Sequence, residues 1–369
     1  MRQLWQITAA ALVAVWASSG TQAQSLDSDA GSLRIQQMVG GLSEPWSLGF
    51  LPGGGLIITE RGGRLLVVEG GASRSIAGVP KVAASGQGGL LDVLVPNDFA
   101  QTREIYLSFA KPQSGGGAGT AVARAVLSQS ATRLEDVRTI FEMTPGASGG
   151  RHFGSRLVEG RDGMIYVTIG ERGDRPAAQD LSRHEGSVVR IARDGSVPAD
   201  NPFVGHSGAQ PEIWSIGHRN PQGAALDANG RLWVAEHGAR GGDEVNLVKK
   251  GQNYGWPVIS YGRHYSGARI GKGTAQAGMQ QPAHYWDPSI APSGMAIYSG
   301  KLWPEWRGDF FVGSLKFSLI SRIDGDTMAE AEQIEGPQTA RVRDVREGPD
   351  GAIWFISENN GAVYRMTPG

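Results

Sequence analysis

Apolar and polar residues alternate in short runs along most of the chain, and turns rich in Asp, Asn, Pro and Gly separate the runs. The segment "SRLVEGRDGMIYVTIGE" from Ser155 shows the unit: an apolar run, an Asp-Gly turn, and a second run with aromatic and β-branched residues. Such turns between apolar runs are typical of tight hairpins, because both central residues need a positive φ. The pattern predicts antiparallel strands, and no segment has the character of a long helix.

The strand–turn–strand unit recurs, and this repeat is the decisive feature of the chain. Its six copies begin at Trp46, Gly89, Ser155, Gln222, Ser293 and Val342. Spacings of roughly 40 to 70 residues suit one four-stranded sheet per copy. A β-sandwich or two stacked barrels is the alternative, but those folds have denser hairpins and no recurring long inserts. We therefore predict an all-β fold, a six-bladed β-propeller of four-stranded antiparallel blades.

The N-terminal segment has a different pattern. "MRQLWQITAAALVAVWASSGTQAQ" combines a positive residue at Arg2, an apolar run, and small residues at Thr21 and Ala23. These features predict a signal peptide at residues 1–23, cleaved after Ala23, in front of a single propeller domain at 24–369. A short membrane anchor is the alternative, but the run is shorter than the roughly 20 residues that a span needs. No later segment is long and apolar enough to cross a membrane, so we expect a periplasmic or secreted protein.

Composition and charge narrow the possible functions. Gly and Pro supply 55 and 19 of the 369 residues, which agrees with many tight turns. A net charge of −1 gives no electrostatic reason to expect nucleic acid as a partner. The chain has no cysteine, which excludes disulfides, Cys–zinc sites and a thiol nucleophile. The absence of a Ser-centred nucleophile elbow, a Walker loop and a GxGxxG helix start disfavours covalent serine chemistry and nucleotide cofactors.

Polar residues beside the predicted inner strands are the candidates for function. In a propeller, inner strands line a central channel and loops at one face build the site. The candidates are Gln87, His152, Arg219, Asn220, Lys316, Arg341 and Arg343. Four cations at equivalent positions favour a ligand that carries carboxylates or several negative charges. For each arginine taken alone, a solvated loop end is the alternative.

His152 is the candidate general base, because the unperturbed pKa of histidine lies near neutral pH. If Arg151 and Arg156 lie close to it, they lower its pKa and keep the ring neutral. A surface histidine in a loop is the alternative. Glu171, in the nearby "GERGD", could simply pair with Arg172.

The segment "WVAEHGARGGDEVNLVKKGQNYGWP" from Trp233 is rich in carboxylates and glycine. Asp243 and Glu244 could supply oxygen ligands for a hard cation such as Ca²⁺. The spacing is not that of an EF-hand loop, and a charged turn of an outer strand is the alternative. Just before this segment, we expect His218 to be structural.

Five stretches together are similar to one known family. "RHFGSRLVEGRDGMIYVTIGE", "EIWSIGHRNPQG", "EHGARGGDEVNLVKKGQNYGWP", "GSLK" and "RVRDVREGPDG" resemble the soluble aldose sugar dehydrogenases that depend on pyrroloquinoline quinone (PQQ), in the glucose/sorbosone dehydrogenase family. The stretches occur in the same order, from about Pro45 to Met366. That family is a six-bladed propeller. The resemblance implies oxidation of the C1 hydroxyl of an aldose to a lactone, with hydride transfer to C5 of PQQ.

The resemblance also implies a role for each candidate. His152 corresponds to the base, Arg219 and Asn220 to residues that contact the quinone, and Gln87 to one that reaches the quinone or the sugar. PQQ carries three carboxylates. The residues implied to hold them are Lys316, Arg341 and Arg343.

Calcium sites are implied in the same way. The backbone carbonyls of Gly238 and Ala239 would bind a Ca²⁺ that bridges protein and cofactor, and a second Ca²⁺ would lie near Glu244 and Tyr254. Two positions depart from the family pattern. Arg151 stands where the glucose-specific branch has an aspartate that can orient the base, so the orienting partner is open. Ala239 replaces a proline.

Two other functions stay open at this point. A Ca²⁺-dependent propeller hydrolase, such as a lactonase, would need several carboxylates and amides around one central metal, whereas the channel candidates are mainly cations. A non-catalytic propeller that binds carbohydrate or protein would need neither a base nor a ring of cations. For a dehydrogenase the partners are an aldose sugar and an electron acceptor that the sequence does not identify, and monomer and dimer are both open.

Overall fold

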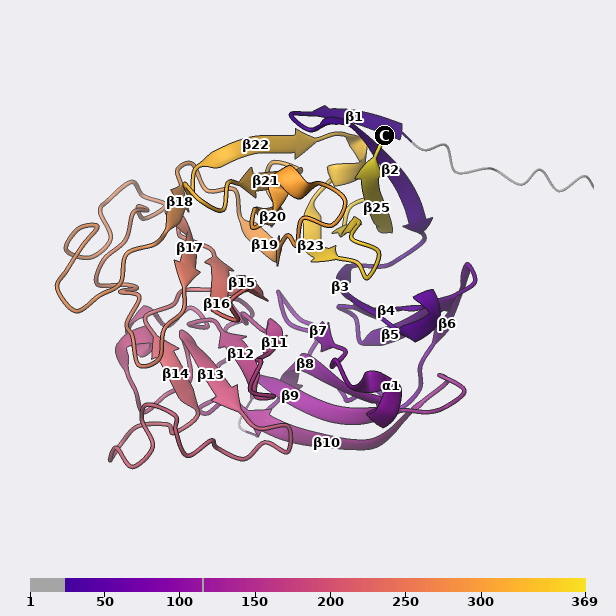
Figure 1. The fold of residues 1–369 in the computed structure, drawn as a ribbon. Helices are drawn as coiled ribbons and strands as arrows, with labels where there is room; N and C mark the ends of the chain where they lie inside the picture. Colours follow the sequence, from indigo (N-terminus) through magenta and orange to yellow (C-terminus); the bar gives the residue numbers. More distant parts are fainter. Residues whose placement is uncertain (1–23, 115) are drawn as a thin grey trace, which may run out of the picture.

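The computed structural model describes residues 24–114 and 116–369, which form six antiparallel sheets around a central channel (Figure 1). The predicted six-bladed β-propeller is confirmed. The innermost strands start at Pro45, Leu90, Leu157, Pro221, Pro292 and Val342. These positions lie within two residues of the repeat starts expected from the sequence. The predicted signal peptide, residues 1–23, lies outside the described residues.

The first three blades follow one another along the chain, each running from its inner to its outer strand. The first contains β3 (Pro45–Phe50), β4 (Leu56–Glu60), β5 (Arg64–Glu69) and β6 (Ala72–Ser75). The second contains β7 (Leu90–Leu94), β8 (Glu104–Pro112), β9 (Ala118–Leu127) and β10 (Leu134–Glu142). The third contains β11 (Leu157–Glu159), β12 (Ile165–Ile169), β13 (Ser187–Ile191) and β14 (Ile213–Ile216).

The remaining blades complete the ring. The fourth contains β15 (Pro221–Leu226), β16 (Leu232–Glu236), β17 (Asp243–Leu247) and β18 (His284–Trp286). The fifth contains β19 (Pro292–Ile297), β20 (Phe310–Ser314), β21 (Leu319–Ile323) and β22 (Glu330–Glu335). The closing blade contains β23 (Val342–Glu347), β24 (Ile353–Ser357), β25 (Ala362–Pro368), β2 (Gly31–Val39) and β1 (Gln24–Ser28).

The closing blade departs from the expected four strands. It has five, and its outer two come from the start of the described chain. β2 pairs with β25, for example Ile35 with Met366, so the two ends of the described chain lie side by side (Figure 1). Leu33 and Ile35 are buried while Arg34 is exposed, and this alternation allows β2 to cover the edge of the sheet.

Helical structure is short throughout the described residues, as expected. The segments are η1 (Pro52–Gly54), α1 (Phe99–Thr102), η2 (Arg175–Gln179), η3 (Pro304–Trp306) and η4 (Pro337–Thr339). Within residues 24–114 and 116–369, no helix has the length and apolar character to cross a membrane.

The apolar core lies between neighbouring sheets. One buried cluster joins Ile57 and Val67 of the first blade to Leu90 and Ile105 of the second. Another joins Phe311 of the fifth blade to Val345 of the closing blade. Each sheet is therefore covered by the next, and the loops that enter the inner strands start from fixed positions.

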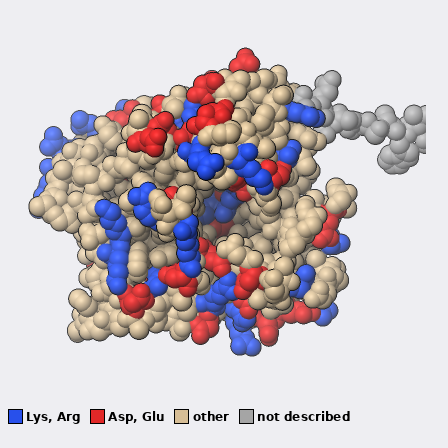
Figure 2. Space-filling model, in the orientation of Figure 1, with Lys and Arg blue, Asp and Glu red and all other residues tan. Residues whose placement is uncertain are grey.

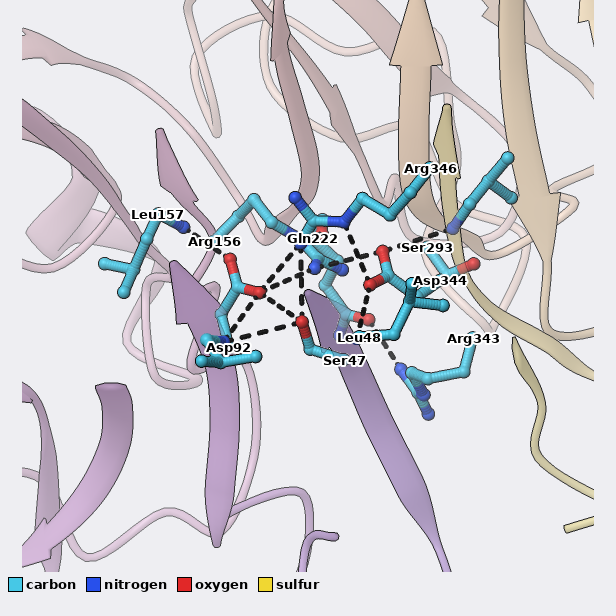
Figure 3. A network of polar contacts seen from close by, with 12 residues as sticks. Ser47, Leu48, Asp92, Arg156, Leu157, Gln222, Ser293, Arg343, Asp344 and Arg346 are labelled. Carbon is cyan, nitrogen blue, oxygen red and sulfur yellow. Dashed lines mark hydrogen bonds and ion pairs between the residues drawn. The ribbon is translucent and has the colours of Figure 1, made fainter. Parts of the chain in front are cut away.

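Polar side chains of the inner strands fill the channel itself (Figure 3). The carboxylates of Asp92 and Asp344 are completely buried. Arg156 Nη1 lies 3.0 Å from Asp92 and 3.1 Å from Asp344. Arg346 pairs with the same two acids at 2.8 and 3.0 Å. This central network ties the second, third and closing blades together.

Candidate active site

A cavity of about 930 Å³ opens at the end of the channel where chain segments enter the inner strands. Most of the residues expected at the site line it. They are Gln87, His152, Arg219, Gly238, Ala239, Lys316, Arg341 and Arg343. Asn220, Glu244 and Tyr254 lie behind this wall instead. The space-filling view shows the hollow with basic side chains beside it (Figure 2).

His152 is held in place from two sides. Its backbone N–H donates to Gln87 Oε1 at 2.7 Å. Its ring Nδ1 pairs with Glu171 Oε1, and the side chains of the two residues are 13% and 2% exposed. Because a carboxylate accepts hydrogen bonds, this contact places the ring proton on Nδ1 and leaves Nε2 free to accept another.

The environment of His152 favours the neutral ring. Burial lowers the pKa of His152, and the positive charges of Arg219 and Arg151 act in the same direction, while Glu171 opposes them. The expected contribution of Arg151 is therefore present. Arg156, which we expected to act in the same way, lies in the central network instead.

Glu171 is the site residue that sequence reasoning missed. The sequence left open a simple pair with Arg172, but the carboxylate of Glu171 contacts His152. A signal was present: Glu171 follows β12, the strand that pairs with β11 just after the histidine loop. The carboxylate that contacts the His152 ring therefore comes from the end of the next hairpin, and the residue at position 151 gave no indication of it.

Arg172 serves a different purpose. Its guanidinium donates to the backbone carbonyls of Arg151, Gly149 and Ala118, the latter two at 2.6 and 3.3 Å. It also lies 3.3 Å from the centroid of the Phe153 ring. Burial lowers the pKa of Arg172 to about 10. Arg172 thus fixes the backbone of the loop that carries His152.

Arg219 and Asn220 present hydrogen-bond donors that have no partner within the described residues. Arg219 Nη1 donates to the His237 carbonyl at 3.3 Å, while its buried Nε is unpaired. Asn220 Oδ1 accepts from the Gly154 backbone at 3.1 Å, and its buried Nδ2 is unpaired. Burial lowers the pKa of Arg219. Two adjacent residues, one lining the cavity and one behind it, therefore carry unsatisfied donors.

Lys316, Arg341 and Arg343 form a wall of three cations that are only partly neutralised. Arg341 and Arg343 share the carboxylate of Glu358, at 3.2 and 2.8 Å. Arg343 also donates to Gln222 Oε1 at 2.9 Å. Lys316 Nζ donates to the Ser289 carbonyl at 3.2 Å. Three positive side chains thus face the cavity with one carboxylate between them, which leaves this wall positive.

A second histidine lines the cavity, and the sequence analysis did not single it out. His237 directly precedes Gly238 in the "EHGA" turn. Burial lowers the pKa of His237 well below its ordinary value. Its Nε2 has no partner among the described residues. A neutral imidazole therefore lines the cavity together with the cations.

The residues suggested as metal ligands form two groups. The backbone of Gly238 and Ala239 lines the main cavity. Glu244 and Tyr254 line a smaller internal cavity behind it, together with Glu236. The Tyr254 hydroxyl donates to the Leu247 carbonyl, so a ligand atom of Tyr254 would have to come from its backbone.

Carboxylates gather around the smaller cavity. Glu236 and Glu244 both accept from the Asn246 amide at 3.1 Å. Burial and the charge of Glu236 raise the pKa of Glu244 to about 8. Asp243 is engaged otherwise, accepting from the Gly238 backbone at 2.7 Å. Within residues 24–114 and 116–369, no group of three or more His, Cys, Asp or Glu side chains is arranged to hold a metal ion.

His218 is structural, as expected. It is completely buried, and its ring nitrogens contact Ser215 Oγ at 2.9 Å and Glu236 Oε1 at 2.8 Å. Its ring also stacks on Tyr254 with centroids 4.6 Å apart. These contacts lie behind the cavity wall.

Known proteins are similar to this chain in sequence and in fold. The family model described as Glucose / Sorbosone dehydrogenase matches residues 42–365. The aldose sugar dehydrogenase YliI of Escherichia coli K12 is 42% identical over 364 residues, 96% of this chain and 95% of that protein. The apo crystal structure of the soluble aldose sugar dehydrogenase from E. coli has a TM-score of 0.87 at 41% identity, covering 91% of this chain and 100% of that one. The PQQ-bound aldose sugar dehydrogenase of Streptomyces coelicolor has a TM-score of 0.76 at 27% identity, covering 94% and 99%. The chain described above therefore belongs to the glucose/sorbosone dehydrogenase family.

Proposed function

We propose that this protein is a PQQ-dependent aldose sugar dehydrogenase that oxidises the C1 hydroxyl of aldoses to the lactone. The observation that carries the proposal is the His152–Glu171 pair at the wall of a cavity rich in cations. The PQQ-bound relative from Streptomyces coelicolor supports the choice of cofactor. The closely similar E. coli relative supports the class of substrate.

The described residues fit PQQ. The carboxylates of the cofactor match the positive wall of Lys316, Arg341 and Arg343. The unpaired donors of Arg219 and Asn220 match its quinone oxygens. When bound, PQQ supplies a quinone that accepts a hydride at C5.

His152 acts as the general base in this proposal. Its Nε2 takes the proton of the C1 hydroxyl as the hydride leaves the same carbon, which makes the sugar carbonyl of the lactone. The proton gives the ring a positive charge, and Glu171 stabilises that charge through Nδ1. Gln87 supports the base by accepting from its backbone N–H, and it reaches the quinone or the sugar. Arg219 places positive charge where negative charge develops.

Calcium belongs to the same proposal. The carbonyls of Gly238 and Ala239 line the cavity, and oxygen atoms are the ligands that Ca²⁺ prefers. Glu244 and the backbone of Tyr254 would hold a second ion at the smaller cavity, where Glu236 adds negative charge. We also propose that residues 1–23 direct export to the periplasm or the medium. The oligomeric state remains monomer or dimer in this proposal.

Reconstitution tests the proposal. Purified apo-protein is mixed with PQQ and Ca²⁺, and aldoses are assayed with an artificial electron acceptor. We expect cofactor binding and dye reduction that both depend on added PQQ. Neither binding nor reduction with any aldose would contradict the proposal, and hydrolysis of a lactone by the apo-protein with Ca²⁺ would favour the hydrolase alternative.

The variant His152→Ala separates binding from chemistry. We expect it to bind PQQ nearly normally and to lose about 10²- to 10⁴-fold in kcat, because proton transfer by a positioned base contributes that much. Cofactor affinity is measured by titration and kcat with saturating sugar. A fully active His152→Ala variant would remove His152 from the mechanism. That result would favour the alternative of a non-catalytic binding propeller, which needs no base.

A further inference from the structure

A hairpin in the long connection between β17 and β18 brings arginines to the rim of the cavity. The backbones of Arg263 and Arg240 exchange two hydrogen bonds of 2.9 Å, and Arg263 also forms a bridge with Arg269. Tyr265 lies between the two arginines of the hairpin, is 73% exposed, and lines the cavity together with Arg240. Residues distant in sequence thus form one surface at the mouth, which we call the arginine rim: Arg240, Arg263 and Arg269.

The charges of the arginine rim are not neutralised. All three side chains are exposed, and within the described residues none forms an ion pair or a side-chain hydrogen bond. Arg175 adds a fourth cation, with Nη1 2.8 Å from His264 Nδ1. Elsewhere many arginines are paired with acids; Arg322, for example, contacts three carboxylates.

Three carboxylates line the cavity with Arg240; Glu44 and Glu358 are paired with other arginines, which leaves Asp287. Three exposed arginines against this acid leave the rim positive, although the whole chain carries a net charge of −1. The view of the hollow shows basic side chains beside it (Figure 2). An acidic partner would therefore be attracted by this surface and not by the overall charge of the protein.

Aromatic side chains lie close to the rim arginines in sequence: Tyr265 is between Arg263 and Arg269, and Tyr261 is two residues before Arg263. Tyr261 and Tyr285 stack with centroids 4.1 Å apart, and Tyr285 is 47% exposed. Arginine and tyrosine are enriched at protein–protein interfaces, where they supply most of the binding energy. A surface of this composition fits a macromolecular partner better than a free small anion.

The proposed reaction needs such a partner. Each sugar oxidised leaves two electrons on the cofactor, and they must reach an acceptor before the next turnover. The central network of Asp92, Arg156 and Asp344 is buried in the channel (Figure 3), so we expect an acceptor to approach through the mouth of the cavity. The arginine rim stands at that mouth.

We propose that the arginine rim docks the acidic face of an electron-carrier protein, an inference that rests on the proposed function. Two carrier molecules each take one electron per sugar, and the two protons go to solvent. The rim steers the carrier to the mouth and takes no part in the oxidation of sugar. Its loss therefore slows the return of the cofactor to its oxidised form and leaves the sugar half-reaction unchanged.

The test uses the double variant Arg263→Glu/Arg269→Glu. The control is Arg133→Glu/Arg138→Glu, which makes the same change of charge at two exposed arginines, one directly before β10 and one on it. The probes are succinylated cytochrome c, an acidic carrier, and native cytochrome c, a basic carrier of the same size and haem. Stopped flow measures reoxidation of sugar-reduced holoenzyme, and retention of apo-protein on each immobilised carrier measures docking without the cofactor.

We expect wild type and control to favour the acidic carrier and the rim variant to lose about tenfold or more in reoxidation at low salt. The loss should fade near 1 M salt, where the Debye length is about 3 Å. Retention on the acidic carrier should fall in parallel, with unchanged reduction of the enzyme by sugar.

Equal losses in both variants, or a preference of wild type for the basic carrier, would overturn the inference. If the rim variant lost reoxidation rate only with hexacyanoferrate, a small anionic acceptor, the rim would act on small anions and the inference would also be overturned. If wild type is not reduced by sugar, the proposed function fails, while the retention experiment still decides the docking.

Discussion

Two groups of charged side chains lie along the same channel, one in the central network and one on the cavity wall. In the network, Asp92 accepts from Ser47 Oγ at 2.5 Å and from the Leu157 backbone at 2.7 Å, besides its two arginines (Figure 3). Arg156 has one unpaired nitrogen, but its guanidinium also lies 4.5 Å from the Trp46 ring. At the wall, Arg219 has a single side-chain hydrogen bond of 3.3 Å, and Asn220, buried behind it, has an unpaired amide.

The contrast separates structural charges from charges that await a ligand. A buried ion pair with complete hydrogen bonding is costly to break, because the remaining charge has no water around it. A buried donor without a partner costs free energy until a ligand satisfies it. The network should therefore govern folding, and the wall should govern binding.

The largest effect on stability is expected for Asp92→Ala. The change leaves Arg156 and Arg346 with one shared acid, and we expect a loss of about 3–5 kcal/mol in the free energy of unfolding. Denaturant unfolding of the apo-protein measures it. Asp136→Ala is the control, because its pair with Arg138 is exposed and 3.6 Å long, and it should cost well under about 1 kcal/mol. Equal losses in the two variants would remove the distinction.

The opposite behaviour is expected of Arg219→Met. Because this guanidinium has so little compensation within the protein, apo stability should change by less than about 1 kcal/mol. PQQ affinity should fall about 10- to 100-fold, or about 1.4–2.8 kcal/mol. Titration of cofactor and unfolding of apo-protein measure the two effects. Arg231→Met, on the exposed turn between β15 and β16 of the same blade, is the control and should change neither.

Glu171→Gln tests how the carboxylate beside His152 affects the pH dependence of activity. The acid limb of kcat/KM for wild type should lie below the ordinary histidine pKa of about 6.5, since burial lowers the pKa of His152. Activity rises as the ring loses its proton, and loss of the Glu171 carboxylate should move that limb to still lower pH. We expect about a tenfold fall in kcat/KM as well.

The control for this pH profile is Glu212→Gln. It breaks a second histidine–glutamate pair, His184 with Glu212 at 3.3 Å, outside the cavity. Its profile should match wild type. An unshifted acid limb in Glu171→Gln would show that the observed titration belongs to another group.

The smallest effect is expected for Arg172→Lys. A lysine cannot reach the carbonyls of Arg151, Gly149 and Ala118 together, so the histidine loop should lose alignment. We expect a fall of about threefold in kcat with little change in KM, since a small misplacement of a base costs rate before binding. Steady-state kinetics measure it. Arg190→Lys, a buried arginine paired with Asp162 and Asp200, should lower stability and leave kcat unchanged.

Much of the architecture could be predicted because it depends on local pattern. Each inner strand begins near an apolar run after a glycine- or proline-rich turn, and those signals lie within a few residues of one another. The fifth strand of the closing blade could not be predicted in this way. β2 pairs with β25 from the opposite end of the chain, and no local signal states which edge a strand will join.

The candidate site divides in the same manner. The motifs indicated His152, Arg219, Lys316, Arg341 and Arg343, and the fold brings all of them to one cavity. The carboxylates that pair with these residues lie in segments outside the motifs. Glu358, between Arg341 and Arg343, lies on the loop after β24 and carries no motif of its own.

The sequence by itself thus determined the repeat, the strand positions and which residue types face the channel, because alternation and turn chemistry act over a few residues. Only the tertiary structure decided how those side chains are paired. It placed Glu171 against His152, and it moved Arg156 from the expected neighbourhood of the base into the central network. The physical reason is that hydrogen bonds and ion pairs depend on distances of about 3 Å between atoms, and such distances are set by the closure of the whole ring of blades.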